Sequence, residues 1–255
     1  FLKCFLQFTE SIYDLNRHKF NFSDCSIMNC IYAGAYIFFN RDLQKTTRFI
    51  GQLFGLKGLV LSTSNENKTL VALRENGEML YSEAEIVELR CNVRIERIFL
   101  IDRPLNKNEF EKITISQKRY YLENNHCNIP VSLSVIDSIK QANIIIYAPG
   151  TQHSSLYPSY LSSGLAGTIA DNKNALKVFI TNIGADYETP TYQASDYILG
   201  AYRYLLLSGK RKYLIDELFN YNLINKSNLK KDNTYVKFDR NNFKNHPVKL
   251  VLDNY

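Results

Sequence analysis

Several features that would assign a function directly are missing from this chain of 255 residues. With only 11 glycines, it has no Gly-x-x-x-x-Gly-Lys-Ser/Thr sequence and no three-glycine fingerprint, which excludes a P-loop and the common dinucleotide-binding turn. No apolar run approaches the roughly 20 residues that a membrane-spanning helix needs. The first residues also lack the basic lead and small-residue cleavage site of a signal peptide. We therefore expect no membrane partner.

The five cysteines lack a metal-binding pattern. Cys25 and Cys30 are close in sequence, but no His or second Cys pair stands at zinc-ligand spacing. An odd number of cysteines also argues against a disulfide framework. Free thiols in a reducing compartment are the simpler interpretation, so we expect a cytoplasmic protein.

The net charge of +6 is placed away from the most informative part of the chain. Between Gln141 and Tyr202 the only Lys or Arg residues are Lys173 and Lys177, and the excess gathers at 210–212 and 230–231. A nucleic-acid-binding protein normally carries a basic stripe on its working face. We interpret the basic runs as solvated surface and expect no nucleic-acid partner.

The first half of the chain predicts helices followed by a β-rich stretch. Apolar spacing indicates helices within 1–20, over 26–39 and over 43–54. Strands are expected at 58–63, 69–74 and 93–101, and Asn76-Gly77 is typical of a hairpin turn. Residues 105–128 are polar and are expected to form an irregular surface excursion.

The second half alternates strands and helices. A helix is expected at 131–140, strands at 142–147 and 176–182, and helices at 155–170 and 191–207; an apolar stretch at 214–223 and a polar tail follow. Such alternation predicts an α/β fold with a parallel sheet and helices on both faces, a three-layer arrangement. We see no linker, so the sequence favours a single domain over 1–255 with a β-rich insertion at about 58–102.

The turn after the strand 142–147 is the first candidate site. Pro149 fixes φ, Gly150 lets a ligand approach the backbone, and hydroxyls come from Thr151, Ser154 and Ser155. At the carboxyl end of a parallel strand, free amides at a helix start favour an anion, which predicts a phosphate-bearing ligand. The alternative is an ordinary strand-to-helix turn with Ser as its cap.

The segment after the next strand, residues 181–190, is the second candidate and should open on the same edge. Asn182 could bond a base or ribose, and Asp186 or Glu188 could hold Mg²⁺ through a phosphate. The alternative is a helix start with acidic residues in its first turn and Thr189 as its cap. His153, inside the first turn, suggests a general base, although no nucleophile is clearly paired with it.

Several segments resemble one known family, in that family's own order. Residues 142–158 resemble the strand and Gly-Pro-Gly-Ser…Thr-Ser…Pro turn of the 2-phospho-L-lactate transferase family, which also includes the bacterial gluconeogenesis factor. Further similar segments are Ser26-Ile27-Met28-Asn29 (Ser-x-Gly-Asn), 82–86 (Gly-Glu-x-x-Ile), Asn182 with Glu188-Thr189 (Asn…Glu-Thr) and 194–197 (Ala-x-Asp-His).

The resemblance implies a Rossmann-like fold that binds phosphorylated ligands at its strand ends. Gly150, Thr151, Ser154 and Ser155 would hold phosphate, and Asn29, Asn182 and Glu188 would line the neighbouring cleft. Some members transfer a phospholactyl group from a guanosine diphosphate carrier with Mg²⁺, whereas others bind uridine diphosphate sugars as regulators without known catalysis.

The chain departs from the family at four positions, where Ala148, Met28 and Ser82 replace glycine and Tyr197 replaces histidine. The family's first strand, Gly-rich loop and Asp-rich metal loop have no counterpart in the chain, which begins with Phe and not Met. We therefore expect an N-terminally incomplete member.

Three functions stay open: a transferase acting on a nucleotide-linked phosphate ester, a UDP-sugar-binding regulator, and an interaction module with a vestigial site. A homo-oligomer is also left open.

Overall fold

The computed structural model describes residues 1–14, 20, 22, 25–88, 90–230, 232–244 and 247–255. These residues form two compact units, 1–65 and 66–255. The single domain expected over 1–255 stays a prediction. Residues 15–19, within the first predicted helical stretch, and Lys231 of the second basic run lie outside the described residues.

The first unit is helical. Its helices are α1 (Leu2–Asp14), α2 (Ile27–Phe38) and α3 (Leu43–Leu53). Ser26 and Asp42 cap α2 and α3 by accepting backbone N–H bonds three residues ahead. A side chain at Gly34 would meet the Cys4 carbonyl oxygen at 1.6 Å, so glycine is what lets α1 and α2 pack closely. The strand expected at 58–63 is wrong: these residues have no regular structure and Leu59 is exposed, without a partner strand.

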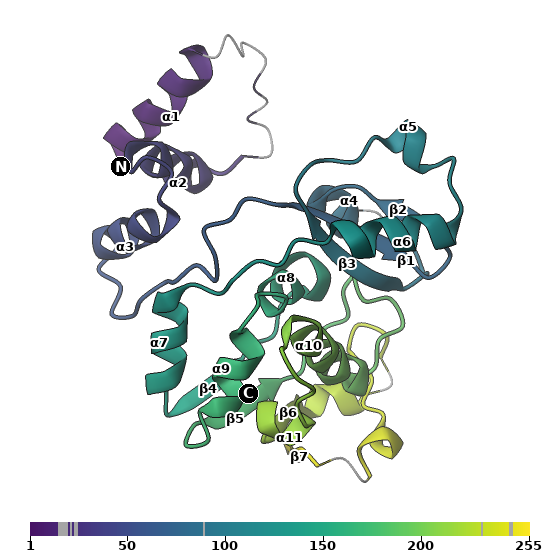
Figure 1. The fold of residues 1–255 in the computed structure, drawn as a ribbon. Helices are drawn as coiled ribbons and strands as arrows, with labels where there is room; N and C mark the ends of the chain where they lie inside the picture. The colour runs from purple at the N-terminus through teal and green to yellow at the C-terminus, as the bar shows by residue number, and fades with distance from the viewer. Residues whose placement is uncertain (15–19, 21, 23–24, 89, 231, 245–246) are drawn as a thin grey trace. The chain divides into compact units, whose positions relative to one another are not determined.

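The second unit begins with a three-stranded antiparallel sheet (Figure 1). Its strands are β1 (Thr69–Arg74), β2 (Met79–Leu80) and β3 (Ile95–Ile101), in the order β2-β1-β3. Gly77, with a φ of 85°, lies in the predicted hairpin turn between β1 and β2. This sheet confirms the β-rich segment.

Three helices lie in and after this sheet, namely α4 (Glu83–Glu88), α5 (Lys107–Phe110) and α6 (Ile115–Asn125). The irregular excursion expected over 105–128 is therefore wrong. Thr114 and Gln117 form a capping box that starts α6. The polar composition of the segment, which suggested a loop, hides this local helix signal. Leu122, fully buried, joins α6 to the core of the antiparallel sheet.

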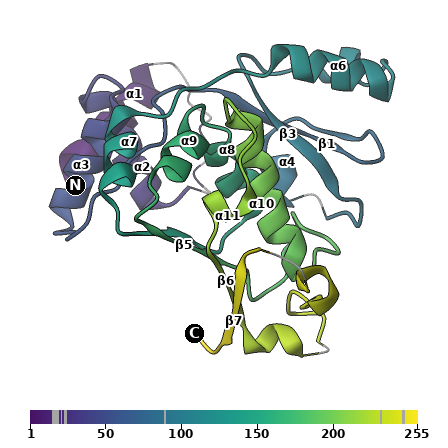
Figure 2. The ribbon, with the colours of Figure 1, turned by 60° about the horizontal axis from the view of Figure 1, so that its bottom comes forward.

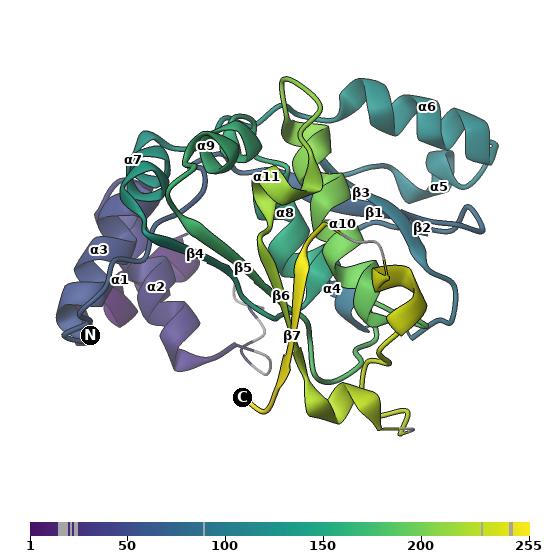
Figure 3. The same cartoon turned by 90° about the horizontal axis from the view of Figure 1, so that it is seen from below.

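The parallel sheet has four strands in sequential order (Figures 2 and 3). They are β4 (Ile144–Tyr147), β5 (Leu176–Ile180), β6 (Tyr221–Asn225) and β7 (Lys249–Asp253). Strands β4 and β5 were expected at nearly these bounds, whereas β6 was expected only as part of an apolar stretch. The fourth strand, β7, lies in what the sequence presented as a polar tail; its half-buried Leu250 and Leu252 alternate with exposed residues.

Helices connect and flank these strands. They are α7 (Leu133–Gln141), α8 (Tyr157–Tyr160), α9 (Leu165–Asp171), α10 (Ala194–Ser208) and α11 (Ile215–Leu218), with a π-helical turn η1 (Gln152–Leu156) and 3-10 turns η2 (Lys226–Leu229) and η3 (Arg240–Phe243). The single helix expected over 155–170 is wrong, because the chain breaks before α9 at Gly164, whose φ is 91°.

The main core lies between the parallel sheet and helices α8 to α10. Tyr147 and Phe179 face this core, whereas Ile144 and Ile146 alternate with the buried side of β4 and are more than half exposed. The predicted α/β fold, a parallel sheet flanked by helices with a β-rich segment, is confirmed. Within the described ranges, no helix combines the length and apolar character needed to cross a bilayer.

Candidate functional site

The two predicted turns follow adjacent parallel strands. Tyr147 of β4 is paired in register with Phe179 of β5, so the segments 148–156 and 181–190 leave the same edge of the sheet. We call these segments the edge turns. Their common position at the carboxyl ends of the strands agrees with the sequence prediction.

Gly150 and Asn182 join the edge turns directly. The amide N–H of Gly150 donates to Oδ1 of Asn182 at 3.2 Å, and Nδ2 of Asn182 donates to the Gly150 carbonyl oxygen at 2.9 Å. Nε2 of the buried Gln152 donates to the same carbonyl at 2.8 Å. Asn182 and the backbone of Gly150 therefore hold the two edge turns together.

Glu188 occupies the amides that the sequence assigned to a phosphate. Its Oε2 accepts the backbone N–H groups of His153 at 2.9 Å and Ser154 at 3.0 Å, and Oε1 accepts the Ser154 hydroxyl. Burial raises the pKa of Glu188, although these hydrogen bonds oppose the shift. The start of η1 is therefore an anion-holding geometry that contains the protein's own carboxylate.

Beside Glu188 lies a short row of hydroxyl groups. Oγ of Ser154 lies within hydrogen-bond distance of Thr151 Oγ1, at 3.0 Å, and Thr151 and Ser155 share a hydrogen bond of 2.7 Å. Ser154 is buried, Thr151 is half-buried, and Ser155 and Pro149 are exposed. The surface that this turn offers to a ligand is thus made by Pro149, Thr151 and Ser155. No Ser caps the turn: Thr151 is the cap residue and makes no side-chain capping bond.

Asp186 organises the second edge turn. Its Oδ1 accepts from the amides of Glu188 at 2.9 Å and Thr189 at 3.0 Å and from the Thr189 hydroxyl, which also contacts Tyr197 Oη at 2.8 Å. Thr189 is consequently not the cap of α10, which is Gln193. Oδ2 of Asp186 is buried and accepts no hydrogen bond from the described residues, and burial raises the pKa of this carboxyl group.

A cavity of about 350 Å³ adjoins this turn. Its lining residues are Arg90, Cys91, Asn92, Asp186, Tyr187, Pro190 and Thr191. The Arg90 guanidinium lies 4.3 Å from the centre of the Tyr187 ring and is exposed. By contrast, Lys177 of β5 donates to the Glu217 carbonyl oxygen at 2.7 Å, and burial lowers its pKa. Arg90 is therefore a cation at the edge turns that no pattern in the sequence indicated.

His153 is a buried core residue of η1. Only 1% of it is exposed, its ring packs edge-on against Tyr157, and Nδ1 has no hydrogen-bond partner within the described part of the chain. Burial, with a contribution from the charge of Arg74, lowers the pKa of His153 to about 3. The imidazole is neutral and points into the core, which does not suit a general base for a ligand at the surface.

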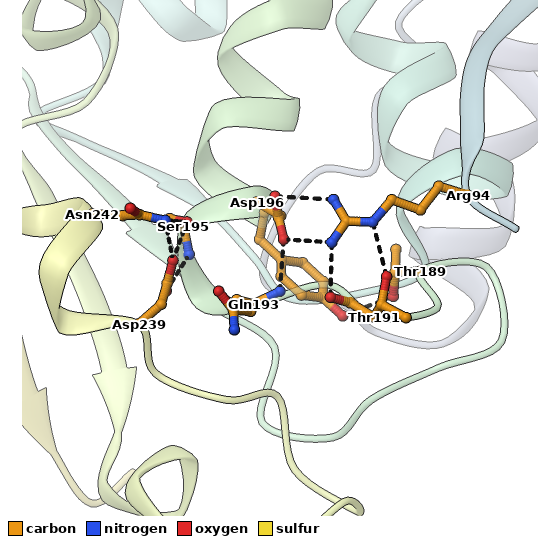
Figure 4. A network of polar contacts seen from close by, with 9 residues as sticks. Arg94, Thr189, Thr191, Gln193, Ser195, Asp196, Asp239 and Asn242 are labelled. Atoms are coloured by element: carbon orange, nitrogen blue, oxygen red, sulfur yellow. Dashed lines mark hydrogen bonds and ion pairs between the residues drawn. The ribbon is translucent and has the colours of Figure 1, made fainter. Parts of the chain in front are cut away.

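Figure 4 shows a second polar network, at the start of α10, that the sequence did not predict. Arg94 donates to both carboxylate oxygens of Asp196, at 3.2 and 3.1 Å, and to the Thr191 carbonyl and hydroxyl oxygens. Asp239 accepts from the amide and hydroxyl of Ser195. The partners lie 44 to 102 residues apart, so no local pattern could have paired them.

Asn29 is the one predicted site residue in the first unit. It is exposed in the first turn of α2, where its amide N–H donates to Ser26 Oγ at 3.1 Å. The assignment of Asn29 to the cleft stays a prediction.

Among the described residues, no group of three or more His, Cys, Asp or Glu side chains forms a metal site. Glu188 is engaged by the amides of η1, so it does not fit the role of an Mg²⁺ ligand. Asp186 Oδ2 is a carboxylate oxygen of the edge turns that accepts no hydrogen bond from the described residues, so it could serve as one ligand.

Comparison with known proteins agrees with this architecture. The chain is 27% identical over 232 residues to a Thermotoga maritima protein provisionally named a gluconeogenesis factor, covering 88% of this chain and 62% of that protein. It is 26% identical over 190 residues to the gluconeogenesis factor of Bacillus subtilis, covering 72% of this chain and 51% of that protein. The chain thus spans about half to three fifths of these relatives' length.

Solved structures show the same fold. A crystal structure of a Bacillus halodurans protein superposes with a TM-score of 0.68 at 20% identity, over 96% of this chain and 71% of the other. A second crystal structure from that organism, described as a member of the UPF0052 family, gives a TM-score of 0.64 at 20% identity, over 90% and 66% of the two chains. The model of the family described as 2-phospho-L-lactate transferase CofD matches residues 7–255, and the chain therefore belongs to that family.

Proposed function

We propose that this protein binds a nucleotide-linked phosphate ester at the edge turns, and that it does so as a regulator of the gluconeogenesis-factor type. The reciprocal bonding of Gly150 and Asn182 carries the proposal, because it fixes the hydroxyls of one turn beside the other turn. A preorganised polar edge at the ends of parallel strands favours small polar ligands. The names of the relatives favour the regulator over the transferase.

The phosphate is proposed to lie against the hydroxyls of Thr151 and Ser155, and not at the amides of His153 and Ser154. Glu188 already fills those amides at 2.9 and 3.0 Å, so a phosphate could reach them only by displacing its carboxylate. The exposed guanidinium of Arg90 would then supply positive charge, since Arg binds phosphate through paired N–H donors.

A uridine diphosphate sugar is the first ligand to test. Isothermal titration should detect binding to the wild type, and Arg90→Gln should weaken it about tenfold, the loss of one charge-assisted hydrogen bond. Thr151→Val and Ser155→Ala together should weaken it similarly with an unchanged melting temperature. Arg103→Gln, at an exposed arginine lining a separate cavity beside β3, is the matched control and should bind normally. Equal affinity in all four proteins would refute the site.

Transfer of a phosphate-containing group is the second candidate function, and it rests on the family description. A coupled assay with a guanosine diphosphate-linked donor and Mg²⁺ tests it. Asp186→Asn separates the two functions: it should abolish Mg²⁺-dependent turnover if the protein is a transferase, whereas UDP-sugar binding without Mg²⁺ should persist. Turnover by the wild type would establish the transferase in place of the regulator.

A further inference from the structure

Two cysteines of the first unit lie in direct contact. Sγ of Cys25 and Sγ of Cys30 are 3.5 Å apart, on either side of the capping residue Ser26 that starts α2. The remaining three thiols have other neighbours: Cys4 is buried in an apolar cluster of the first unit, Cys91 Sγ accepts the Val93 amide, and Cys127 Sγ contacts the Asn125 carbonyl oxygen. Cys25 and Cys30 are thus two thiols whose sulfur atoms are in contact.

The two thiols differ in access. Cys25 is partly exposed, whereas only 2% of Cys30 is exposed. Both stand at the amino-terminal end of the 12-residue helix α2. Burial and the contact with Cys25 raise the pKa of Cys30. Cys25 is therefore the thiol that an external reagent reaches first, with Cys30 behind it.

We propose that Cys25 and Cys30 are a reversible redox pair whose oxidant is a small disulfide of the glutathione type. The Cys25 thiolate attacks one sulfur of the disulfide, forms a mixed disulfide and releases one thiolate. The Cys30 thiolate then attacks Cys25 Sγ, closes the intramolecular disulfide and releases the second thiol. Two protein thiols are oxidised and one small disulfide is reduced to two thiols, so that protons and electrons balance.

The bond would tie the residue before the helix cap to the first turn of α2. The segment that it closes contains Ser26 and Asn29, which are already joined by the capping bond of 3.1 Å. A covalent closure around a capped helix start removes freedom from the unfolded chain more than from the folded one. Oxidation should therefore raise the melting temperature of the full chain and change the surroundings of the exposed Asn29.

The test is oxidation of the full chain in a glutathione redox buffer, followed by thiol counting under denaturing conditions. The wild type should lose two of its five thiols, and dithiothreitol should restore them. The Cys91→Ser/Cys127→Ser double variant is the matched control and should also lose two. Tryptic cleavage should yield residues 20–41 as one peptide containing both cysteines, lighter by about 2 Da than its reduced form.

Cys30→Ser should instead accumulate a stable mixed disulfide on Cys25, because the resolving thiol is missing. Should this buried substitution impair folding, the wild-type peptide mass decides the question alone. A peptide 20–41 that stays reduced, while Cys91 or Cys127 becomes glutathionylated, would overturn the proposal. Loss of two thiols in Cys25→Ser would overturn it as well.

Discussion

Two helix starts in the second unit are held by carboxylates, but in different electrostatic surroundings. At η1, Glu188 accepts the amides of His153 and Ser154, and its charged neighbour Asp186 raises the Glu188 pKa further. At α10, Asp196 accepts the Gln193 amide at 2.8 Å and is paired with the Arg94 guanidinium (Figure 4). One carboxylate is therefore held by peptide dipoles and a hydroxyl, and the other by a full positive charge.

This difference indicates at which of the two helix starts an added anion would change the stability of the protein. At the start of α10, Arg94 balances the charge of Asp196, and about a third of each of these two side chains is exposed to solvent. The η1 start is buried and depends on a carboxylate whose ionised form is disfavoured there. A backbone arrangement that binds an anion this way should also accept a small external anion when the carboxylate is removed.

The largest expected effect is that of Glu188→Ala. Removing the carboxylate leaves two buried amides and a hydroxyl without their acceptor, so the free energy of unfolding should fall by about 3 kcal/mol. Acetate at millimolar concentration should restore part of the melting temperature of this variant. Thermal denaturation with and without acetate measures both effects.

Two controls accompany that measurement. Glu188→Gln retains an acceptor oxygen and should lose about 1 kcal/mol or less. The wild type should not respond to acetate, because its own carboxylate fills the position. An equal response to acetate in Glu188→Ala and the wild type would show that the stabilisation is non-specific.

Arg94→Met should come next, with a loss of about 2 kcal/mol in the free energy of unfolding, because a half-buried Asp196 loses its partner. Urea denaturation measures the loss. Arg211→Met is the matched control, since Arg211 also makes a two-bond contact with a carboxylate, that of Glu217, but is about half exposed. It should cost less than Arg94→Met, because solvent screens an exposed pair. Equal losses in the two variants would mean that burial does not distinguish these pairs.

His153 in η1 should make the free energy of unfolding depend on pH. Its pKa of about 3 in the folded state lies below the value near 6.5 expected when unfolded, so acid adds protons to the unfolded state first. The stabilising contribution is complete above about pH 6.5 and is lost as the pH falls, by about 1 kcal/mol between pH 7 and 5.5. His153→Gln should lower the slope of stability against pH in this window. An unchanged slope would contradict the burial of a neutral imidazole.

The sequence predicted the elements that have a clear local hydrophobic pattern. The prediction failed for elements whose structure depends on residues far away in the sequence. Strand β4 is a continuous apolar run and β5 is apolar except for Lys177. Asn182 could be placed beside the first turn because parallel strands share an edge. Strand β7 alternates only weakly and forms because β6 offers it a partner, with Asn222 opposite Leu250. A local pattern does not contain that information.

The candidate site could likewise be predicted from the sequence only in part. Composition and position correctly indicated a turn rich in hydroxyls and amides after β4. The sequence did not reveal that Glu188, 34 residues away, would occupy the amides of that turn. Arg90 was also missed, because it approaches Tyr187 only through the folding of the β-rich segment.

The smallest expected change in stability is that of Gly150→Ala. A methyl group there would meet Leu156 Cδ1 at 3.6 Å, an ordinary contact, so the free energy of unfolding should change by less than about 0.5 kcal/mol. Gly200→Ala in α10 is the contrast: its methyl would lie 2.1 Å from Tyr157 Oη and should cost about 2 kcal/mol.

Because Gly150→Ala should keep its stability, titrating this variant with a uridine diphosphate sugar measures how far binding depends on close approach of the ligand to the Gly150 backbone. Affinity should fall about tenfold if phosphate contacts the turn at Gly150. Unchanged affinity would exclude that contact and leave the ligand on the hydroxyls of Thr151 and Ser155, where Glu188 already prevents it from reaching the amides.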